Sequence, residues 1–417
     1  MDRDIECSDS LPPISMTANL QIACFSIHYI IEALANGVVR HLKSSLSFVK
    51  NICGQEFSAQ SVRFRFVESM GTADIITRAS LMGKEIEGWN LRLNTAALMP
   101  AIALGTSTIA KSETPEEMRA IIRNGLQAGY RHFDTAAVYG TEHLLGEVLK
   151  EVLTSGALRR EDVFITSKLG LSDAHLDDVI PAIRKSLREL QLDYVDLYML
   201  HFPLRLKRGK NPFQGLSEDS FAPFDLIGVW KALEHSVELG LTRAVGICNS
   251  GSKILQQIAA DAKMMPAVNQ VEMHPGCLQP KLLDTCKQLG TILMAYFPLG
   301  SPGNLRLGEG TSLVINSPIL KAIAQKHGKT VEQVALRWTL DHGAGFVCKS
   351  RNPTRLTQYL GAFGWNLDNE EHKRIETMPR FMLQDWSVWC NATTSPYRTP
   401  KEILDDWFDS DEVNVHT

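Results

Sequence analysis

Four polar residues whose side chains can take part in proton transfer, Asp134, Tyr139, Lys168 and His201, are predicted to lie where four successive β-strands end. The segments that carry them are apolar and rich in β-forming residues, which is typical of strands buried on both faces. In a (β/α)8 barrel, polar residues at the carboxyl ends of the strands face the active site. An acid, a phenol, an amine and an imidazole gathered there indicate proton transfer to a carbonyl or hydroxyl group.

The surrounding pattern predicts the elements that position these residues. Strands are expected at 100–105 and near His132, Val163, Asp196, Ala244, Ala267, Thr291 and Gly345, after a hairpin near Leu91. Helical stretches separate the strands. One of them starts with Thr114 as N-cap, Pro115 in the first turn and Glu117 to complete a capping box, and Gly129 can end it. Eight strand–helix units with right-handed crossovers predict an α/β fold, a (β/α)8 TIM barrel with an N-terminal hairpin.

The length of 417 residues exceeds the roughly 250 that one such barrel typically needs. Residues 89–417 are predicted to form the barrel and a C-terminal tail. Residues 1–88 lack the strand–helix rhythm and are predicted to be an extension that is poorly ordered or loosely helical. The extension could be an alternative or mis-predicted start, or a partner-binding or oligomerisation segment.

Composition excludes several classes of partner. The net charge of −4 gives no reason to expect nucleic acid, and none of the eight cysteines forms a CxxC pair or has zinc spacing. The acidic start disfavours a signal or transit peptide, and the most apolar stretch, 22–39, contains His28, Glu32 and Asn36, which disfavours a membrane span. We expect a cytoplasmic monomer that binds no metal, membrane or nucleic acid.

Three connections are longer than usual: 203–224, 298–316 and the tail after Pro379. Long loops that follow barrel strands lie on the catalytic face and are candidates for the substrate pocket. In the tail, Trp386, Trp389 and Tyr397 could form an aromatic lid or pack against the barrel exterior. Both placements remain open from the sequence.

Residues 89–400 resemble the aldo-keto reductase family. The resemblance rests on 129–136 (GYRHFDTA), 193–198 (DYVDLY), 269–272 (NQVE), 296–300 (YFPLG), and Lys349-Ser350 followed by Arg355. Segments 181–187 and 223–230 resemble the plant subgroup of codeinone-reductase-like and chalcone-reductase-like enzymes, and 82–86 resembles a native start for the family. The resemblance implies NADPH-dependent reduction of an aldehyde or ketone to an alcohol, in plant specialised metabolism.

Carbonyl reduction needs a hydride at carbon and a proton at oxygen. No side chain donates hydride, so a nicotinamide must supply it. Free tyrosine, with a pKa of about 10, is a weak proton donor, and the ammonium of Lys168 is expected to lower the pKa of Tyr139. Asp134 would keep Lys168 charged and oriented, and His201 would polarise the carbonyl oxygen. The resemblance implies the same four roles.

The chain has no GxGxxG after its first strand, so the cofactor is expected to bind in another way. The resemblance implies a cofactor site for NADPH/NADP+ made by Gly105, Thr106, Asn249, Gln270, Tyr296, Leu299, Lys349, Ser350 and Arg355. Asn249 and Gln270 would bind the carboxamide, Tyr296 would stack on the ring, and the last three would hold the 2′-phosphate, which Arg and Lys suit. The implied substrate contacts are His201, Phe202, Trp386 and Trp389.

Several positions depart from the family pattern. Cys248 and Phe297 replace serines and Cys348 replaces a proline, which leaves the cofactor affinity open. Phe202, Gly170 and Cys277 stand where larger aromatics are common, which predicts a wider pocket. Two other functions stay open: a catalytically weak, redox-sensing cofactor-binding subunit, and a lyase that uses Lys168 as a Schiff base.

Overall fold

The computed structural model describes residues 89–107, 113–210, 212, 215–302, 312–391 and 393–408. The predicted extension 1–88 lies outside the described residues, and the barrel is described by itself below.

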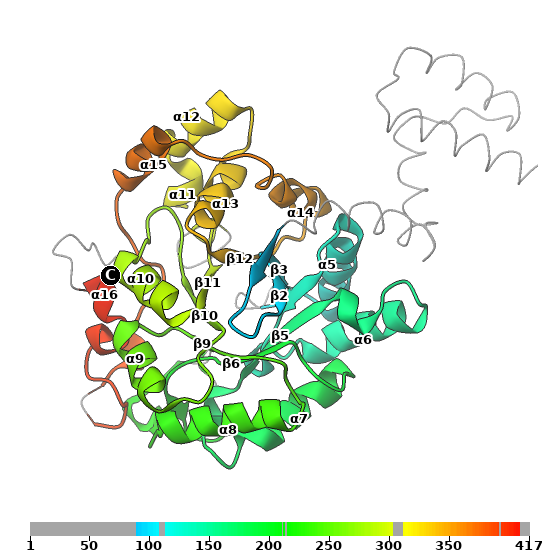
Figure 1. The fold of residues 1–417 in the computed structure, drawn as a ribbon, viewed down its shortest axis with the longest axis vertical. Coiled ribbons are helices and arrows are strands. Elements are labelled where there is room, and N and C mark those ends of the chain that lie inside the picture. The colour runs from blue at the N-terminus through cyan, green and yellow to red at the C-terminus, as the bar shows by residue number, and fades with distance from the viewer. Residues whose placement is uncertain are drawn as a thin grey trace, which may run out of the picture. The chain divides into compact units, whose positions relative to one another are not determined.

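Eight parallel strands close into a barrel at the centre of this part of the chain (Figure 1). In order around the barrel they are β3 (Ile102–Gly105), β4 (His132–Asp134), β5 (Phe164–Leu169), β6 (Leu197–Leu200), β9 (Val245–Cys248), β10 (Val268–Glu272), β11 (Ile292–Tyr296) and β12 (Gly345–Cys348). The pairing of β12 with β3 closes the ring. All eight strands lie where the sequence predicts them, and the (β/α)8 TIM barrel is confirmed.

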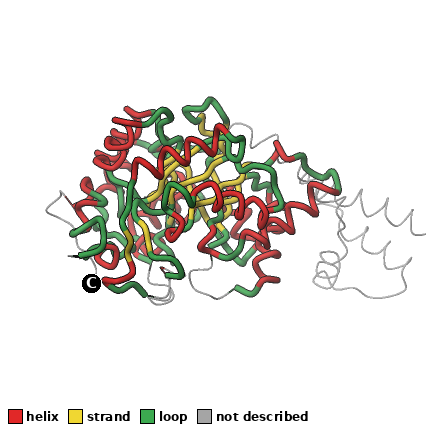
Figure 2. Tube along the Cα trace, turned by 90° about the horizontal axis from the view of Figure 1, so that it is seen from below, coloured by secondary structure: helices red, strands yellow, loops and turns green. Residues whose placement is uncertain are grey.

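Helices surround the strands, which Figure 2 shows from the side. The surrounding helices are α5 (Pro115–Ala128), α6 (Glu142–Thr154), α7 (Val179–Leu190), α8 (Leu226–Glu238), α9 (Ser252–Asp261), α10 (Pro280–Leu289), α13 (Val331–Asp341) and α14 (Pro353–Leu360). Short α11 (Leu313–Asn316) and α12 (Pro318–His327) precede α13, and α15 (Asn369–Glu376) and α16 (Asp405–Phe408) follow α14. A two-stranded ribbon, β7 (Arg205–Leu206) with β8 (Phe221–Ala222), lies within the long loop after β6.

Helix α5 begins as its sequence predicts. The hydroxyl of Thr114 accepts the backbone N–H of Glu117 at 3.2 Å, and the Glu117 carboxylate accepts the N–H of Thr114 at 2.7 Å. This capping box satisfies two N–H groups that the first turn would leave unpaired. Gly129 ends the helix with φ of 104°, a left-handed conformation that glycine adopts without strain.

The predicted hairpin is formed by β1 (Asn90–Arg92) and β2 (Leu98–Pro100). Its buried residues Leu93 and Met99 pack in one apolar cluster with Phe164, Leu197 and Val268, which begin β5, β6 and β10. The hairpin therefore covers the amino ends of the strands, and the carboxyl ends are left for the candidate site.

Three strands, rather than the four predicted, bring the four candidate catalytic residues together. Asp134 ends β4, Lys168 is the next-to-last residue of β5, and His201 directly follows β6. Tyr139 instead ends a short 3-10 helix, η2 (Ala137–Tyr139), in the connection after β4. The prediction of four strands was wrong, because β4 contributes Asp134 at its end and the turn that follows β4 contributes Tyr139.

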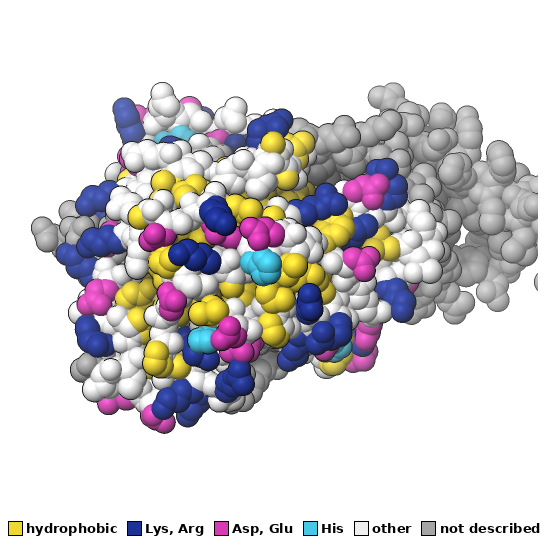
Figure 3. All heavy atoms as spheres, turned by 60° about the horizontal axis from the view of Figure 1, so that its bottom comes forward, with side chains coloured by type: hydrophobic (Ala, Val, Ile, Leu, Met, Phe, Trp, Pro, Cys, Tyr) yellow, Lys and Arg dark blue, Asp and Glu magenta, His cyan; other side chains and the backbone are white. Residues whose placement is uncertain are grey.

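On the face shown in Figure 3, Lys and Arg side chains are interspersed with Asp and Glu side chains. No helix among the described residues has both the length and the apolar character that a membrane crossing requires.

Candidate active site

A buried ion pair forms the centre of the site. The Lys168 ammonium donates hydrogen bonds to Asp134 Oδ1 at 2.5 Å and to the Thr135 carbonyl at 3.1 Å, and the two charged side chains are 0% and 4% exposed. Gln270 Nε2 donates to the other Asp134 oxygen at 2.8 Å. Both carboxylate oxygens are therefore engaged, which fixes the position of the ammonium.

The surroundings keep Lys168 charged. Burial acts to lower the pKa of Lys168, but the charge of Asp134 outweighs it and raises the pKa above the usual value. A lysine that forms a Schiff base must lose its proton before it attacks a carbonyl. The Asp134 contact therefore disfavours the lyase reading.

Tyr139 lies between the ion pair and His201. Its ring centroid is 5.2 Å from Lys168 Nζ and 5.5 Å from the centroid of the His201 ring, in an edge-to-face arrangement. Burial raises the pKa of Tyr139 to about 12, although Lys168 acts to lower it. The ammonium acts in the predicted direction, but desolvation of the phenolate outweighs its attraction, so the net shift of the pKa is upward. Tyr139 is thus a protonated phenol at neutral pH.

His201 is buried and neutral. Burial, reinforced by the charge of Lys168, holds the pKa of His201 well below its usual range. Its Nδ1 has no hydrogen-bond partner within the described part of the chain. A neutral imidazole carries one N–H donor and one acceptor, so this ring can offer a hydrogen bond to a carbonyl oxygen.

Asn249 and Tyr296 border these residues. Asn249 follows β9 in a left-handed conformation, with φ of 59°, and its Nδ2 donates to the His201 carbonyl at 2.9 Å. The Tyr296 hydroxyl, at the end of β11, donates to Asn249 Oδ1 at 2.9 Å. Together with Gln270, these residues place amide groups and an aromatic ring beside the ion pair, a donor set that suits a nicotinamide.

Other residues predicted to bind the cofactor are held by protein contacts. Thr106 is buried, and its hydroxyl donates to the Thr135 hydroxyl and lies 2.9 Å from that of Thr141. Gly105 precedes it at the end of β3. Leu299 is also buried, and its carbonyl accepts the Ser312 hydroxyl at 2.9 Å.

Cationic residues gather beyond the end of β12. Lys349 Nζ donates to the Ser107 carbonyl at 2.6 Å and to Glu113 Oε1 at 2.9 Å. Arg355, exposed on α14, forms no ion pair with a described carboxylate. Ser350 Oγ accepts the N–H of Asn352 at 3.1 Å. A lysine and an arginine suit a phosphate group. The acid beside Lys349, Glu113, was not predicted from the sequence, because no motif marks it.

Aromatic side chains of the tail pack beside His201. The Phe202 ring stacks on Trp389 with centroids 4.2 Å apart and lies 6.1 Å from Trp386. The Tyr397 hydroxyl donates to the Pro203 carbonyl at 2.7 Å. Of the two placements left open for the tail, the structure shows these residues at the catalytic end of the barrel.

The structure places four of the positions that depart from the family pattern. Cys248 is buried, and burial raises the pKa of its thiol to about 12, so it stays uncharged. Cys348 is also buried, 3.4 Å from the Tyr130 hydroxyl. A Cβ at Gly170, directly after β5, would lie 2.8 Å from Asp173 Oδ2 and 4.0 Å from the Cβ of Ala137 in η2. Cys277 is also buried.

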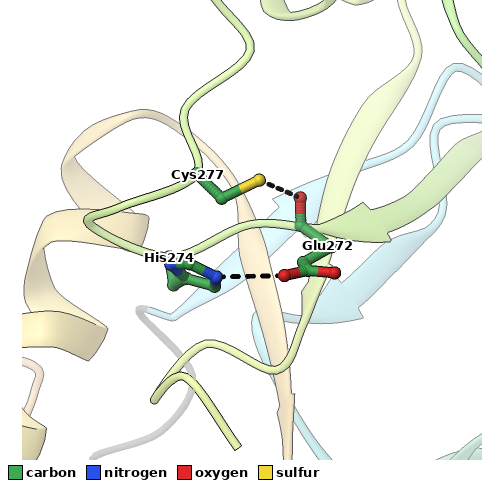
Figure 4. Close-up of side chains that lie close together, drawn as sticks. All are labelled: Glu272, His274 and Cys277. Atoms are coloured by element: carbon green, nitrogen blue, oxygen red, sulfur yellow. Dashed lines mark hydrogen bonds and ion pairs between the residues drawn. The ribbon is translucent and has the colours of Figure 1, made fainter. Parts of the chain in front are cut away.

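Among the described residues, Glu272, His274 and Cys277 are the one group whose ligand atoms lie close enough for a metal ion (Figure 4). Gly276 N–H donates to His274 Nδ1 at 3.2 Å, so His274 Nε2 carries the proton and donates to Glu272 Oε1 at 3.1 Å. The Cys277 thiol donates to the Glu272 carbonyl at 3.6 Å. These contacts occupy both ring nitrogens and the thiol.

The two carboxylate oxygens of Glu272 hold the tail. Oε1 accepts the backbone N–H of Leu383 at 2.6 Å, and Oε2 accepts that of Gln384 at 2.9 Å. Glu272 ends β10, so this contact ties the tail that carries Trp386 and Trp389 directly to a barrel strand. Glu272 therefore anchors the tail to β10.

Comparisons with known proteins agree with this geometry. The sequence model of the Aldo/keto reductase family matches residues 101–379. Deoxymugineic acid synthase 1 of Oryza sativa subsp. japonica is 42% identical over 316 residues, which cover 75% of this chain and 95% of that protein. NADPH-dependent codeinone reductase 1-5 of Papaver somniferum is 40% identical over 317 residues, 76% of this chain and 97% of that protein.

A solved structure shows the same fold. The aldo-keto reductase of Bombyx mori, in complex with NADP, is 32% identical and superimposes with a TM-score of 0.67 over 74% of this chain and 98% of that one. With the family model spanning most of the barrel, this chain belongs to the aldo/keto reductase family of oxidoreductases.

Proposed function

We propose that Asp134, Tyr139, Lys168 and His201 catalyse the reduction of an aldehyde or ketone to an alcohol with NADPH. The observation that carries this proposal is the protonated Tyr139 phenol between a fixed ammonium and a neutral imidazole. Bound NADPH supplies the hydride. His201 donates a hydrogen bond to the carbonyl oxygen and orients it, and Tyr139 gives that oxygen its proton.

Lys168 makes the proton transfer possible. As Tyr139 releases its proton, negative charge develops on the phenolic oxygen, and the nearby ammonium stabilises it in a site with little water. Asp134 positions Lys168 and keeps it charged, and Gln270 in turn holds Asp134. Trp386 and Trp389, beside Phe202, would cover the substrate and exclude water.

The proposed cofactor site includes Lys349, Ser350 and Arg355, whose charges suit the 2′-phosphate that distinguishes NADPH from NADH. The codeinone reductase is named for NADPH dependence, and the Bombyx mori enzyme was solved with NADP, which supports this choice. Asn249, Gln270 and Tyr296 would hold the nicotinamide, with Gly105, Thr106 and Leu299 shaping the backbone around it.

The substrate we propose is a bulky carbonyl compound of plant specialised metabolism, since two relatives from plants are named for deoxymugineic acid and for codeinone. Phe202 and Gly170, which stand where the family resemblance implies larger aromatics, would leave more room for it. The test is NADPH oxidation, followed by absorbance, across aldehydes of graded size. A sharp preference for the smallest aldehydes would contradict the wide pocket, and no oxidation with any carbonyl class would contradict the function.

The setting we propose is a cytoplasmic monomer that meets only its small-molecule substrate and its cofactor. The barrel of residues 89–417 would carry all of the catalytic groups. Light scattering of the purified full chain tests the monomer directly.

A further inference from the structure

An acidic residue lies among the cations at the end of β12. Glu113 directly precedes Thr114, the N-cap of α5, and the pairing of β12 with β3 brings it close to the residues after β12. Its Oε1 is 2.9 Å from Lys349 Nζ and 3.4 Å from Arg351 Nε. Although 236 residues separate Glu113 from Lys349, the two charges form one ion-paired group.

The Glu113 side chain is only 5% exposed. Burial acts to raise the pKa of Glu113, but the hydrogen bonds and charges of Lys349 and Arg351 lower it below the usual value, so the group is a carboxylate at neutral pH. Its second oxygen, Oε2, is buried and has no partner among the described residues. A buried carboxylate with one unpartnered oxygen thus occupies a place between cations that would suit an external anion.

Building on the proposed function, we propose that Glu113 is an internal counter-ion that competes with the cofactor's 2′-phosphate for Lys349 and so limits the preference for NADPH over NADH. Lys349 has three N–H donors, and Ser107 and Glu113 already take two of them. A phosphate that approaches Lys349 either displaces the carboxylate or lies beside a like charge. Arg355, which pairs with no described carboxylate, remains available to the phosphate.

The competition predicts an effect on the 2′-phosphate alone. Glu113→Gln keeps the shape of the side chain and removes its charge. In titration calorimetry with the full chain, this variant should bind NADP+ and adenosine 2′,5′-bisphosphate about five- to tenfold more tightly, the scale of one partly exposed ion pair. Binding of NAD+, which lacks the 2′-phosphate, should change less than about twofold.

Glu116→Gln is the matched control. Glu116 lies three residues further along, is 80% exposed and pairs with Arg119 instead. Glu116→Gln removes the same charge from the same segment and should leave the affinities for NADP+, adenosine 2′,5′-bisphosphate and NAD+ unchanged. Glu113→Ala, checked for an unchanged melting temperature, should repeat the selective gain.

The outcomes separate this inference from the function on which it rests. If the wild-type chain binds NADP+ but Glu113→Gln binds it equally or less tightly, Glu113 does not compete and the inference is overturned. A parallel gain for NAD+ would overturn it too, because the effect would not belong to the 2′-phosphate. If the wild-type chain binds neither dinucleotide, the proposed function fails as well.

Discussion

The phenolic oxygen of Tyr139 is the proposed proton donor, and substitution by phenylalanine removes that one atom. Tyr139→Phe should lower kcat for carbonyl reduction by about two to four powers of ten, the usual contribution of a positioned general acid. NADPH affinity, measured by the quenching of protein fluorescence, should stay within about twofold, because the change leaves Lys168 and Asp134 in place.

Tyr194→Phe is the control for that substitution. Tyr194 lies before β6, at the opposite end of the barrel, between the guanidinium groups of Arg160 and Arg243. The Tyr194→Phe variant also loses a phenolic oxygen, but far from the site, and it should keep full activity. A Tyr139→Phe variant as active as Tyr194→Phe would remove Tyr139 from the mechanism.

The raised pKa of Tyr139 has a consequence for the pH profile. Because burial raises it to about 12, the phenol stays protonated as the pH rises through the neutral and mildly alkaline range. His201, whose pKa is held well below its usual range, stays neutral down to acidic pH. We expect kcat/KM for reduction to be nearly constant between about pH 6 and 9. An alkaline fall with an apparent pKa near 8 would mean that another group, or a phenol of much lower pKa, gives the proton.

At the residue scale, local sequence identified the types of the catalytic groups but not their electrostatics. Asp134 and Lys168 stand out because charged residues inside apolar strands are unusual. The bond from Gln270 to Asp134 joins residues 136 positions apart, and the contact of Glu113 with Lys349 spans a greater distance along the chain. Neither has a local signal, because both exist only once the barrel has closed. The net direction of the Tyr139 pKa likewise depends on burial that the sequence does not reveal.

At the scale of elements, the tail is the part whose position depends most on one side chain. Glu272→Gln replaces one acceptor oxygen with an N–H2 group that faces the N–H of Leu383 or Gln384, and a buried donor left unpaired costs about 1–3 kcal/mol. We expect a looser tail and therefore a several-fold higher KM for the carbonyl substrate, while kcat changes less. Faster cleavage after the tail's aromatic residues in limited proteolysis would report the loosening directly.

Glu402→Gln provides the comparison within the same tail. Glu402 also accepts a backbone N–H, that of Arg398 at 3.0 Å, but its side chain is exposed to water that can replace the bond. The KM and the cleavage pattern of the Glu402→Gln variant should match those of the wild type. Equal effects of the two substitutions would show that the anchor at β10 does not control the tail.

Elements differed in how well the sequence predicted them. Helix α5 was predictable at both ends because its capping box and terminal glycine act within a few residues. The barrel strands were predictable because burial on both faces leaves continuous apolar runs. The position of the tail was not predictable, since the contact that anchors it reaches 111 residues back along the chain to Glu272. The η2 turn was not predictable either, because its three residues carry no periodic pattern.

At the scale of the whole molecule, barrel closure makes residues 89–408 interdependent, since the last strand, β12, pairs with the first, β3. The alignment of 95% of the rice relative with 75% of this chain supports the proposal that the catalytic unit does not need residues 1–88. A shortened chain that begins at Met82 should keep its melting temperature within about 2 °C, corresponding to less than roughly 1 kcal/mol, and its kcat/KM within about twofold.

A second shortened chain, beginning at Ala101, tests whether that result is informative. It lacks the β1–β2 hairpin, so Phe164, Leu197 and Val268 lose the cover of Leu93 and Met99. Exposing apolar side chains that were fully buried costs about 1.5–3 kcal/mol each, so this chain should melt several degrees lower. If the chain from Met82 melted as low as the chain from Ala101, or lost its activity, residues 1–81 would have to stabilise the barrel, and the predicted separation of the extension from the barrel would be wrong. If only the chain from Ala101 is destabilised, the hairpin marks the beginning of the folded catalytic unit.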